Sequence, residues 1–582
     1  MGGMAGIYVG LSGLQTSSNS LNTTANNLSN VNTDGYVRQQ IVNKDLAYTY
    51  VGTTSGTTTG KNGLGVTVAK VNHVRDIFLD AAYRKENGRN GFYEKMYESL
   101  YEIETQMGES EFITGIGFQN NITDFLEALH EVAKTPGDVT ARSALVQSAS
   151  QFIDSAQTIY KGLVNYQNNL NEEIKEVVAR INEIGETLVD LNRRISKIET
   201  GGYEIAADLR DARDLLLDEL SSYCKITVNE EDSGAVSVMM EGVMFANQLG
   251  YTKMGLEQIP GTTFVNPIWP ALDNQSVYNF KGTISTALNT DIGGLKGLLV
   301  ARGLMTPTYE NVDAPEPDVA DYMTAEYPTG EDNPKYISAM NEYEQYTLSK
   351  DTSTLVNVIA NFDKLVSTMV TEINDILCPE TTITAADGTV YTVLDIDKSS
   401  VTNDGEVGYE LFTRGYCDRY KIQTIDGVEY YVRNDINSFG NASSYTIMNL
   451  SVNENILRDY SRIPLTKRDG SEDYEKAKEL VDKFSADLLT YNGSHDILTF
   501  EEFYESMVND VANTGKIYKS MQENEQELTN QLDSQRLEIM GVSSDEELSN
   551  MIRFQQAYNA SSRYINVVSE MIETLIMNLG VG

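Results

Sequence analysis

The stretch IYVGLSGLQTSSNSLNTTANNL, residues 7–28, places apolar or small residues alternately four and three positions apart. This is the heptad spacing by which helices pack on other helices. Between Met1 and Thr33 there is no charged side chain, so the other faces of the helix carry Ser, Thr, Asn and Gln. Exposed helices normally carry charge, so we predict that this helix is covered by other helices. Its predicted interface positions are Ile7, Leu11, Leu14, Leu21 and Leu28.

The C-terminal residues have a similar pattern. Apolar or small residues again recur three and four positions apart from Leu548 to Leu579, and from Ala557 onward only three side chains are charged. Two weakly charged helices at opposite ends predict that the termini pack together and on neighbouring subunits. An ordinary contact of two helices within one domain would have the same spacing and stays open as the alternative. The predicted interface positions here are Leu548, Met551, Tyr558, Ile565, Ile572, Ile576 and Leu579.

Length and charge limit the classes of partner. With 582 residues the chain is long enough for about four domains. It has 85 acidic and 44 basic side chains, a formal net charge of -41. Phosphate backbones and anionic lipid surfaces repel such a chain, so we expect neither nucleic acid nor a membrane as a partner. No long apolar run and no secretory signal pattern occurs, so we expect no membrane insertion and no cleaved secretory signal.

Residues with the chemistry for catalysis or metal binding are few and scattered. The three cysteines form neither a disulfide framework nor a zinc motif. His130-Glu131 lacks the second histidine of a metalloprotease helix, because Lys134 stands four residues after His130. The loop at 56–62 is too short between its glycines for a phosphate loop, and Ser, His and Asp at 494–496 are too close in sequence for a catalytic triad. We therefore predict no catalytic, metal or cofactor site.

Between the two ends the sequence predicts a long helical body. Heptad spacing from Leu163 to Ile198, with charged outer faces, predicts a bundle helix about 50 Å long that ends at Gly201-Gly202. Residues 503–539 predict a second long helix that returns alongside it, and residues 355–376 an amphipathic helix that Pro379 ends. Alternation with period two predicts strands at 225–228, 235–238 and 428–432.

The predicted fold is α+β and multidomain, with a terminal helical coiled coil, a long helical bundle and β-rich central outer domains. Proline supports this division, because ten of the eleven prolines lie between Pro260 and Pro464 and long helices exclude proline. We expect a terminal assembly domain from residues 1–45 with 530–582, a mainly helical rod-like domain from residues 46–225 with 285–378 and 495–529, and strand-rich outer insertions at 226–284 and 379–494.

Short motifs at both ends resemble those of bacterial flagellar rod, hook and hook-associated proteins. Leu11-Ser12-Gly13-Leu14, the Asn-rich run 26–33 and the run 35–39 are similar to the amino-terminal signature of this axial group. The Tyr-x-Arg-Gln form at 36–39 is most similar to the hook-associated FlgK family. The segments 541–547 and 552–558 resemble that family's carboxy-terminal pattern, with Ser543-Ser544 where the family has Asn-Leu. The motif positions at the two ends are Gly35, Tyr36, Arg38, Gln39, Gly541, Asp545, Glu546 and Glu547.

Two internal segments extend this resemblance to about half of the chain. Residues 208–214 resemble the family's Asp-Leu-x-Asp-x-Arg-Asp segment, and residues 294–303 its Gly-x-Leu-x-Gly stretch, although Gly303 stands where the family has Asp. The resemblance implies a structural protein of the bacterial flagellum, without catalysis or cofactors, that polymerises through its terminal helices at the junction between hook and filament. It does not cover the outer insertions.

The resemblance also implies partners and a location. The implied partners are further copies of the chain, the flagellar hook protein, a FlgL-like second hook-associated protein and a FlgN-like export chaperone on the C-terminal helix. The implied location is extracellular, in the flagellum, after export through the flagellar type III apparatus. Two alternatives stay open: a hook or other axial protein, against which the length and Asp545-Glu546-Glu547 argue, and an adhesive outer-surface protein that uses the central insertions.

Overall fold

The computed structural model describes residues 2–46, 48–51, 60–108, 117–200, 205–492 and 496–579. The helices are α1 (Gly2–Ser29), α2 (Ile77–Met107), α3 (Phe118–Lys134), α4 (Val139–Glu199), α5 (Ala207–Tyr223), α6 (Gly294–Arg302), α7 (Tyr309–Val312), α8 (Pro334–Lys350), α9 (Thr354–Leu377), α10 (Glu454–Arg458), α11 (Tyr474–Phe484), α12 (Phe500–Met540) and α13 (Ser544–Leu579). The strands are β1 (Gln39–Asp45), β2 (Thr49–Val51), β3 (Gly60–Asn62), β4 (Val66–His73), β5 (Ile226–Glu230), β6 (Val236–Met240), β7 (Val243–Ala246), β8 (Gly255–Gln258), β9 (Val265–Trp269), β10 (Gln275–Ser276), β11 (Glu380–Thr384), β12 (Val390–Leu394), β13 (Phe412–Arg414), β14 (Tyr420–Ile425), β15 (Val428–Arg433), β16 (Leu450–Val452), β17 (Leu489–Thr490) and β18 (Ile497–Leu498).

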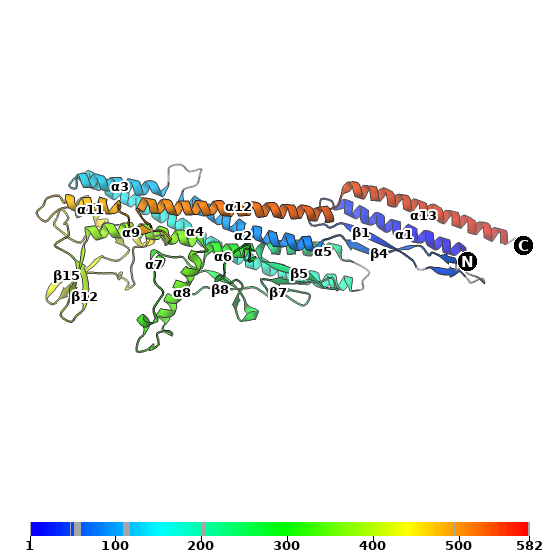
Figure 1. The fold of residues 1–582 in the computed structure, drawn as a ribbon, viewed down its shortest axis with the longest axis horizontal. Helices are drawn as coiled ribbons and strands as arrows, with labels where there is room; N and C mark the ends of the chain where they lie inside the picture. Colours follow the sequence, from blue (N-terminus) through cyan, green and yellow to red (C-terminus); the bar gives the residue numbers. More distant parts are fainter. Residues whose placement is uncertain are drawn as a thin grey trace.

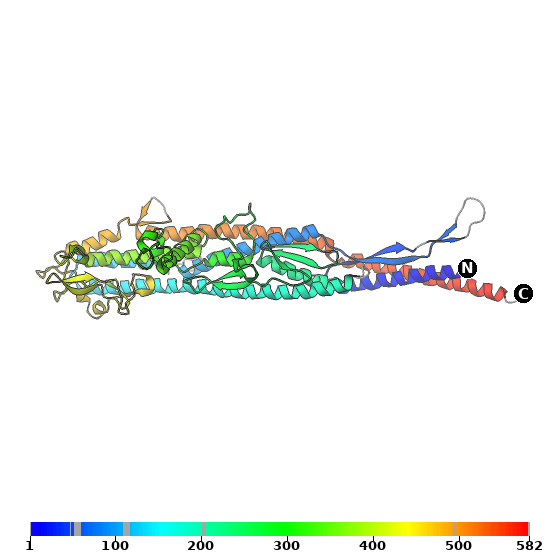
Figure 2. The same cartoon turned by 90° about the horizontal axis from the view of Figure 1, so that it is seen from below.

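These elements form an elongated rod with both termini at the same end (Figure 1). The helices α1 and α13 make up that end, and α2, α4 and α12 run along the middle of the rod (Figures 1 and 2). The opposite end carries α3, α11 and the β12–β15 region, while α8 projects sideways from the middle (Figure 1). The predicted α+β multidomain fold is confirmed.

An antiparallel ribbon lies beside the terminal helices. β1 pairs with β4, with a register shift between Val42 and Asn43, and β2 pairs with β3 further out. The hydroxyl of Thr16 on α1 donates to the carbonyl of Val66 on β4 at 3.5 Å, so the ribbon is attached to α1. The expected domain boundary at residue 45 falls inside this ribbon. The expected boundary at residue 530 falls inside α12, which continues to Met540 before the chain bends.

The predicted long helices are present, and one is longer than expected. α4 has 61 residues, about 90 Å, because its buried apolar stripe begins at Leu145 rather than at Leu163. The predicted stop at Gly201-Gly202 lies outside the described residues. α12 begins at Phe500 and is capped by Thr499, whose hydroxyl and the carboxylate of Glu502 form a capping box. It packs mainly along α2 rather than along α4.

The main core lies between α3, α4, α9 and α12. Phe118 packs against Phe152, Phe362 and Tyr504 in tilted or edge-on arrangements with ring centroids 4.9 to 5.5 Å apart, and Phe125 stacks on Phe152 at 5.7 Å. These aromatic contacts join helices that are distant in sequence. α9 ends at Leu377, directly before Cys378 and Pro379, as predicted.

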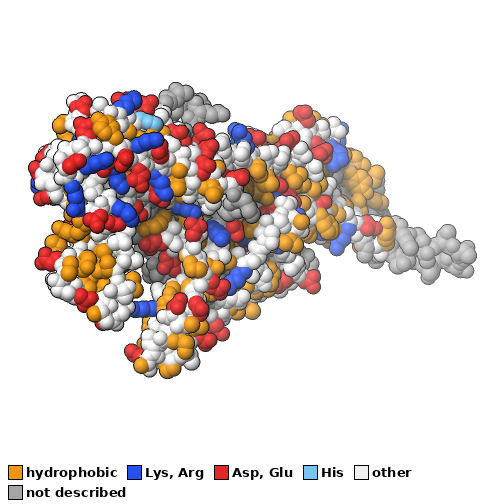
Figure 3. All heavy atoms as spheres, turned by 60° about the vertical axis from the view of Figure 1, so that its left-hand side comes forward, with side chains coloured by type: hydrophobic (Ala, Val, Ile, Leu, Met, Phe, Trp, Pro, Cys, Tyr) orange, Lys and Arg blue, Asp and Glu red, His pale blue; other side chains and the backbone are white. Residues whose placement is uncertain are grey.

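Small antiparallel sheets cover the sides and the outer end of the body. β5, β6 and β7 form one sheet in that order, β10, β9 and β8 another, and β11, β12, β15 and β14 a third. The strands predicted at 225–228, 235–238 and 428–432 correspond to β5, β6 and β15. Charged side chains of both signs are spread over the body, with acidic groups prominent (Figure 3). The three cysteines, Cys224, Cys378 and Cys417, are buried and free.

Candidate assembly interface

α1 packs on α13 through a stripe of glycines. A Cβ added at Gly10 would lie 2.5 Å from Cγ1 of Ile565, and one added at Gly6 would lie 3.3 Å from both methyl groups of Val568. At Gly13 it would lie 2.8 Å from the hydroxyl of Ser561. Glycines four and three positions apart therefore let the two backbones come closer than larger side chains would allow.

The same side of α1 continues with small polar residues. Ser17, Ser20, Thr24 and Asn27 are buried, although all four are polar. Ser20 donates its hydroxyl hydrogen to the carbonyl of Thr16 at 2.9 Å, the local bond by which a buried hydroxyl is satisfied within a helix. The buried face of α1 is thus small and polar rather than apolar.

The predicted interface positions of α1 lie on its other faces. Ile7, Leu14, Leu21 and Leu28 are half-buried and Leu11 is 44% exposed. On α13, Met551, Ile565 and Ile572 are half-buried, whereas Leu548, Tyr558 and Ile576 are exposed. The side chain of Leu579 lies outside the described residues. Of these positions, Ile565 reaches the glycine stripe of α1.

The outer surface of the terminal pair is apolar and almost uncharged. α1 has no charged side chain, and α13 has five acidic and two basic ones. Large apolar side chains that α1 and the ribbon leave exposed on α13 include those of Ile552, Val567, Met571, Leu575 and Met577. A surface of this kind is typical of a site that other protein chains cover.

The amino-terminal motif closes against α1 through Asn27. The side-chain carbonyl of Asn27 accepts from the Tyr36 hydroxyl at 2.8 Å and from the Gln39 N–H at 3.1 Å. Its amide donates to the Gln39 carbonyl at 2.9 Å. Burial, with the nearby carboxylates of Asp211 and Glu547, raises the pKa of Tyr36 to about 12, so this hydroxyl keeps its proton at neutral pH.

Gly35 allows the tight turn that starts this contact. Its φ is 74°, in the left-handed region, and an added Cβ would lie 2.5 Å from Cγ of Leu215 on α5.

The motifs of the two chain ends meet in an ion-pair clamp. Arg38 donates from Nη2 to Glu546 at 2.8 Å and from Nε to Glu547 at 2.9 Å. The Glu547 side chain is only 2% exposed, and the Arg38 backbone N–H donates to the Met540 carbonyl at 2.9 Å. The hydrogen bond to Glu546 is the main cause that raises the pKa of Arg38, and burial opposes it. Gly541 ends α12, and Asp545 lies exposed in the first turn of α13.

A second ion-pair cluster joins the ribbon to the body. His73 Nε2 lies 2.5 Å from Asp211, whose other oxygen accepts from the Val37 N–H at 3.3 Å. Arg75 donates to Asp80 and to Asp214, both at 2.5 Å. The cluster thus uses the 208–214 segment that the sequence singled out.

The cluster also holds the end of α12. Arg536 donates to Asp80 at 2.9 Å and to Asp218 at 2.6 Å. Burial by itself disfavours a charged Asp214, but Arg75, Arg213 and Arg84 hold the pKa of this carboxyl below its ordinary value. α2, α5, α12 and the segment that follows β4 are therefore tied together by these ion pairs.

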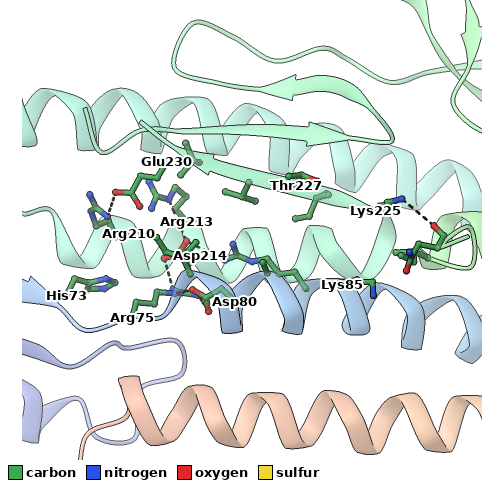
Figure 4. Close-up of a pocket in the computed structure, with 18 residues that line it drawn as sticks. His73, Arg75, Asp80, Lys85, Arg210, Arg213, Asp214, Lys225, Thr227 and Glu230 are labelled. Carbon is green, nitrogen blue, oxygen red and sulfur yellow. Dashed lines mark hydrogen bonds and ion pairs between the residues drawn. The ribbon is translucent and has the colours of Figure 1, made fainter. Parts of the chain in front are cut away.

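A pocket of about 430 Å³ opens beside this cluster, between β5 and the start of α2 (Figure 4). Arg75, Asp80, Arg213 and Asp214 gather at one end of the pocket, while Lys85 and Lys225 lie at the other end (Figure 4).

The rejected chemical motifs find no new support. His130 is exposed on α3, and the loop at 56–62 and His495 lie wholly or partly outside the described residues. Among the residues that the structure describes, no group of three or more His, Cys, Asp or Glu side chains is placed to hold a metal ion. None of the described helices is long and apolar enough to cross a membrane.

Three features of the interface escaped the sequence analysis: the glycine stripe, the role of Asn27, and the junction of Arg75 with Asp80. The glycine stripe had a signal, because Gly6, Gly10 and Gly13 have helical spacing on a face without charge. Asn27 lay within the Asn-rich run but had no assigned role. Nothing in the sequence brings Arg536 of α12 together with Asp80, to which Arg75 also donates.

Three family models match this chain. The model for the flagellar hook-associated protein FlgK helical domain matches residues 100–388. The model for the flagella basal body rod protein matches residues 7–36, and that for the flagellar basal body rod FlgEFG protein C-terminal matches residues 533–579. The last two matches fall on α1 with the following turn and on α13 with the end of α12.

Several characterised proteins are similar over nearly the whole chain. Flagellar hook-associated protein 1 of Bacillus subtilis is 24% identical over 567 residues, which cover 96% of this chain and 94% of the relative. The protein of the same name from Escherichia coli is 23% identical over 583 residues, which cover 97% of this chain and 98% of the relative. The solved structure of the flagellar hook junction protein FlgK from Burkholderia pseudomallei matches 78% of this chain and 99% of its own, with 11% identity and a TM-score of 0.47.

Proposed function

Because the chain belongs to the FlgK family of flagellar hook-associated proteins, and is therefore a structural protein of the flagellum and not an enzyme, we propose that it forms the junction between hook and filament. It does so by polymerising through α1 and α13. Contacts of this kind are heterologous, so each subunit offers one face to the next and another to the previous one.

One observation carries the proposal. In the contact within the subunit α1 uses its glycines and small polar residues, and the pair leaves apolar side chains such as Leu11, Leu548 and Leu575 exposed. Exposed apolar surface is costly in water, so its coverage by neighbouring copies supplies free energy for assembly. The near absence of charge supports this, because a charged group buried at each repeat would carry a desolvation cost.

The partners follow from this position. We propose that the chain contacts further copies of itself, the hook protein and a FlgL-like hook-associated protein. Before assembly, the exposed apolar face of α13 is the surface for a FlgN-like export chaperone. The location is extracellular, reached through the flagellar type III apparatus without a cleaved secretory signal.

We propose a small change in the domain boundaries. The ribbon is attached to α1 and the chain bends only after Met540, so the terminal assembly domain consists of residues 2–73 with 544–579. The rod-like domain then keeps the whole of α12, and the insertions at 226–284 and 379–494 form the outer parts.

The proposal is tested by charged substitutions in α1 and α13. Leu14→Asp and Ile565→Asp, each expressed in a strain that lacks the gene, are expected to leave the body folded but to abolish incorporation into flagella, because each copy would bury an unpaired charge. Electron microscopy counts the filaments, and circular dichroism checks the purified chains. Ile422→Asp, at an exposed position on β14, is the matched control and is expected to assemble normally.

The strain that lacks the gene tests the position in the flagellum. If the chain forms the junction, this strain is expected to have intact hooks without filaments. Missing hooks would favour the hook-protein alternative. Normal filaments with both Leu14→Asp and Ile565→Asp would count against assembly through these helices.

A further inference from the structure

The pocket beside β5 is a groove along a free sheet edge. β5 pairs with β6 on one side, and the described residues place no strand on its other side. The Lys225 carbonyl accepts from the Glu241 N–H, so the backbone groups of Lys225 point toward β6. Because successive residues of a strand face opposite sides, the backbone N–H and C=O groups of Ile226, Val228 and Glu230 point toward the free edge.

The opposite wall of the groove is a helix face. Ile77, Ala81 and Lys85 follow each other at intervals of four residues along α2, line the groove and are exposed, Ile77 by 67%. Side chains of β5 and α2 point toward one another across it (Figure 4). Val236 and Ile292 add apolar surface. A groove between a free strand edge and a helix is the arrangement that takes up an extended peptide as an additional strand.

The charge of the groove is opposite to that of the chain. Six cationic side chains line it against three carboxylates, whereas the whole chain has a net charge of -41. Lys85 and Lys225 lie at the end away from the ion-pair cluster (Figure 4). The lining cations are Arg75, Arg84, Lys85, Arg210, Arg213 and Lys225, and the carboxylates are those of Asp80, Asp214 and Glu230.

One of these cations has an unused donor. The Arg213 side chain is 2% exposed, and its Nη1 donates to the Gly234 carbonyl at 2.7 Å. Its Nε lies 3.7 Å from Asp214 and makes no hydrogen bond within the described structure. A buried donor without an acceptor costs free energy, and an acidic side chain that enters the groove would supply the acceptor.

We propose that this groove binds an extended acidic peptide segment of a partner protein, which adds as a strand to the free edge of β5. Its backbone pairs with Ile226, Val228 and Glu230, its apolar side chains lie against Ile77 and Ala81, and its carboxylates meet the cations. The apolar wall and the free strand edge disfavour nucleic acid as the occupant. The site is distinct from the polymerising surfaces of α1 and α13, because neither helix lines it.

The test uses the full chain and a fluorescein-labelled, acetylated heptapeptide of alternating Glu and Val, with fluorescence anisotropy as the readout. Saturable binding is expected. Lys85→Glu with Lys225→Glu is expected to weaken it by about tenfold or more, and Lys134→Glu, the same change at an exposed position on α3, by less than about twofold. Val228→Pro removes an N–H that faces the free edge, which edge strands tolerate, and is expected to weaken binding about tenfold.

Two peptide controls separate strand addition from simple charge attraction. A peptide methylated at alternate backbone nitrogens cannot pair with β5 and is expected not to compete, and a peptide with Lys in place of Glu is expected not to bind. The inference is overturned if the acidic peptide shows no saturable binding, if the methylated peptide competes equally well, or if the Lys85→Glu, Lys225→Glu chain binds as wild type does. Matching circular dichroism spectra confirm that the variants are folded.

Discussion

The terminal helix pair and the helical body are built from helices with the same heptad spacing, yet they bury opposite kinds of side chain. In the body, the predicted stripe of α4 is turned inward, and Leu163, Ile174 and Ile181 are fully buried. In the terminal pair, α1 turns its glycines and small polar residues toward α13, while Leu11 and Leu575 remain exposed. Heptad spacing therefore predicts that a helix face is covered, but not whether the cover comes from the same chain.

The largest expected effect comes from placing one charge in each region. Ile181→Asp buries an unpaired carboxylate in the body and is expected to lower the free energy of unfolding of the body by more than about 4 kcal/mol. This is enough to abolish the cooperative thermal unfolding of the body. Leu575→Asp on α13 is expected to change stability by less than about 0.5 kcal/mol while it prevents assembly. Equal loss of stability in the two variants would remove the distinction between the regions.

The clamp between the two regions comes next. Arg38→Ala leaves Glu547 buried without its cation and is expected to lower the stability of this contact by about 3 kcal/mol. The loss is expected to be measurable mainly as faster amide hydrogen exchange at the start of α13. Arg553→Ala, an exposed arginine on the same helix, is the control and is expected to leave exchange unchanged. Unaltered exchange in Arg38→Ala would mean that the clamp does not hold the terminal pair.

The regions should also differ in their response to pH. Asp363 on α9 accepts backbone N–H groups of Tyr309 and Ile447 at 2.8 Å, and burial raises its pKa to about 6 against these bonds. A raised pKa means that the folded state binds the proton of Asp363 more tightly than the unfolded chain does. Proton binding therefore stabilises the folded state fully below about pH 4, and this stabilisation is lost as the pH rises through 6. α1 contains no side chain that titrates in this range.

Urea unfolding at pH 4.5 and 7.5 measures this difference. Relative to Asp363→Asn, the free energy of unfolding of the wild-type body is expected to fall by about 2 kcal/mol from pH 4.5 to pH 7.5. The same pH change is expected to leave the protection of the α1 amides unaffected, when each exchange rate is compared with the intrinsic rate at that pH. A pH dependence identical in wild type and Asp363→Asn would show that another group is responsible.

The smallest expected effect is the difference in stability between two glycine-to-alanine substitutions, one in each region. Gly10→Ala places a Cβ 2.5 Å from Ile565 and is expected to weaken the contact of α1 with α13 by about 1 kcal/mol. A Cβ added by Gly515→Ala on α12 meets the Glu104 side chain at 3.3 Å and Cβ of Leu100 at 4.0 Å, and the change is expected to stabilise the body by up to about 1 kcal/mol through helix propensity. Thermal unfolding and amide exchange distinguish the two, and a stabilising Gly10→Ala would show that the glycine stripe is not needed for close packing.

Much of the fold could be predicted because its signals are local. The spacing from Leu163 to Ile198 predicted α4, Pro379 predicted the end of α9, and the alternation at 428–432 predicted β15. The length of α4 was underestimated, because its buried stripe continues before Leu163 with the same spacing, through Leu145, Ala149, Phe152, Ala156 and Ile159, and the prediction did not include these positions. The resemblance to the FlgK family rested on the residues at 35–39 and 541–547, and the chain ends that carry these motifs meet through Arg38, Glu546 and Glu547.

The sequence by itself determined that both terminal helices are amphipathic and carry few charges, because periodicity and charge are properties of the chain alone. Only the tertiary structure decided which face of α1 meets α13, since glycine contributes no apolar signal and its value lies in how closely another backbone can approach. It likewise decided that Arg75, Asp80, Asp214 and Arg536 form one junction. The pairs Arg75–Asp214 and Arg536–Asp80 join positions 139 and 456 residues apart, and their free energy depends on a burial that no local pattern records.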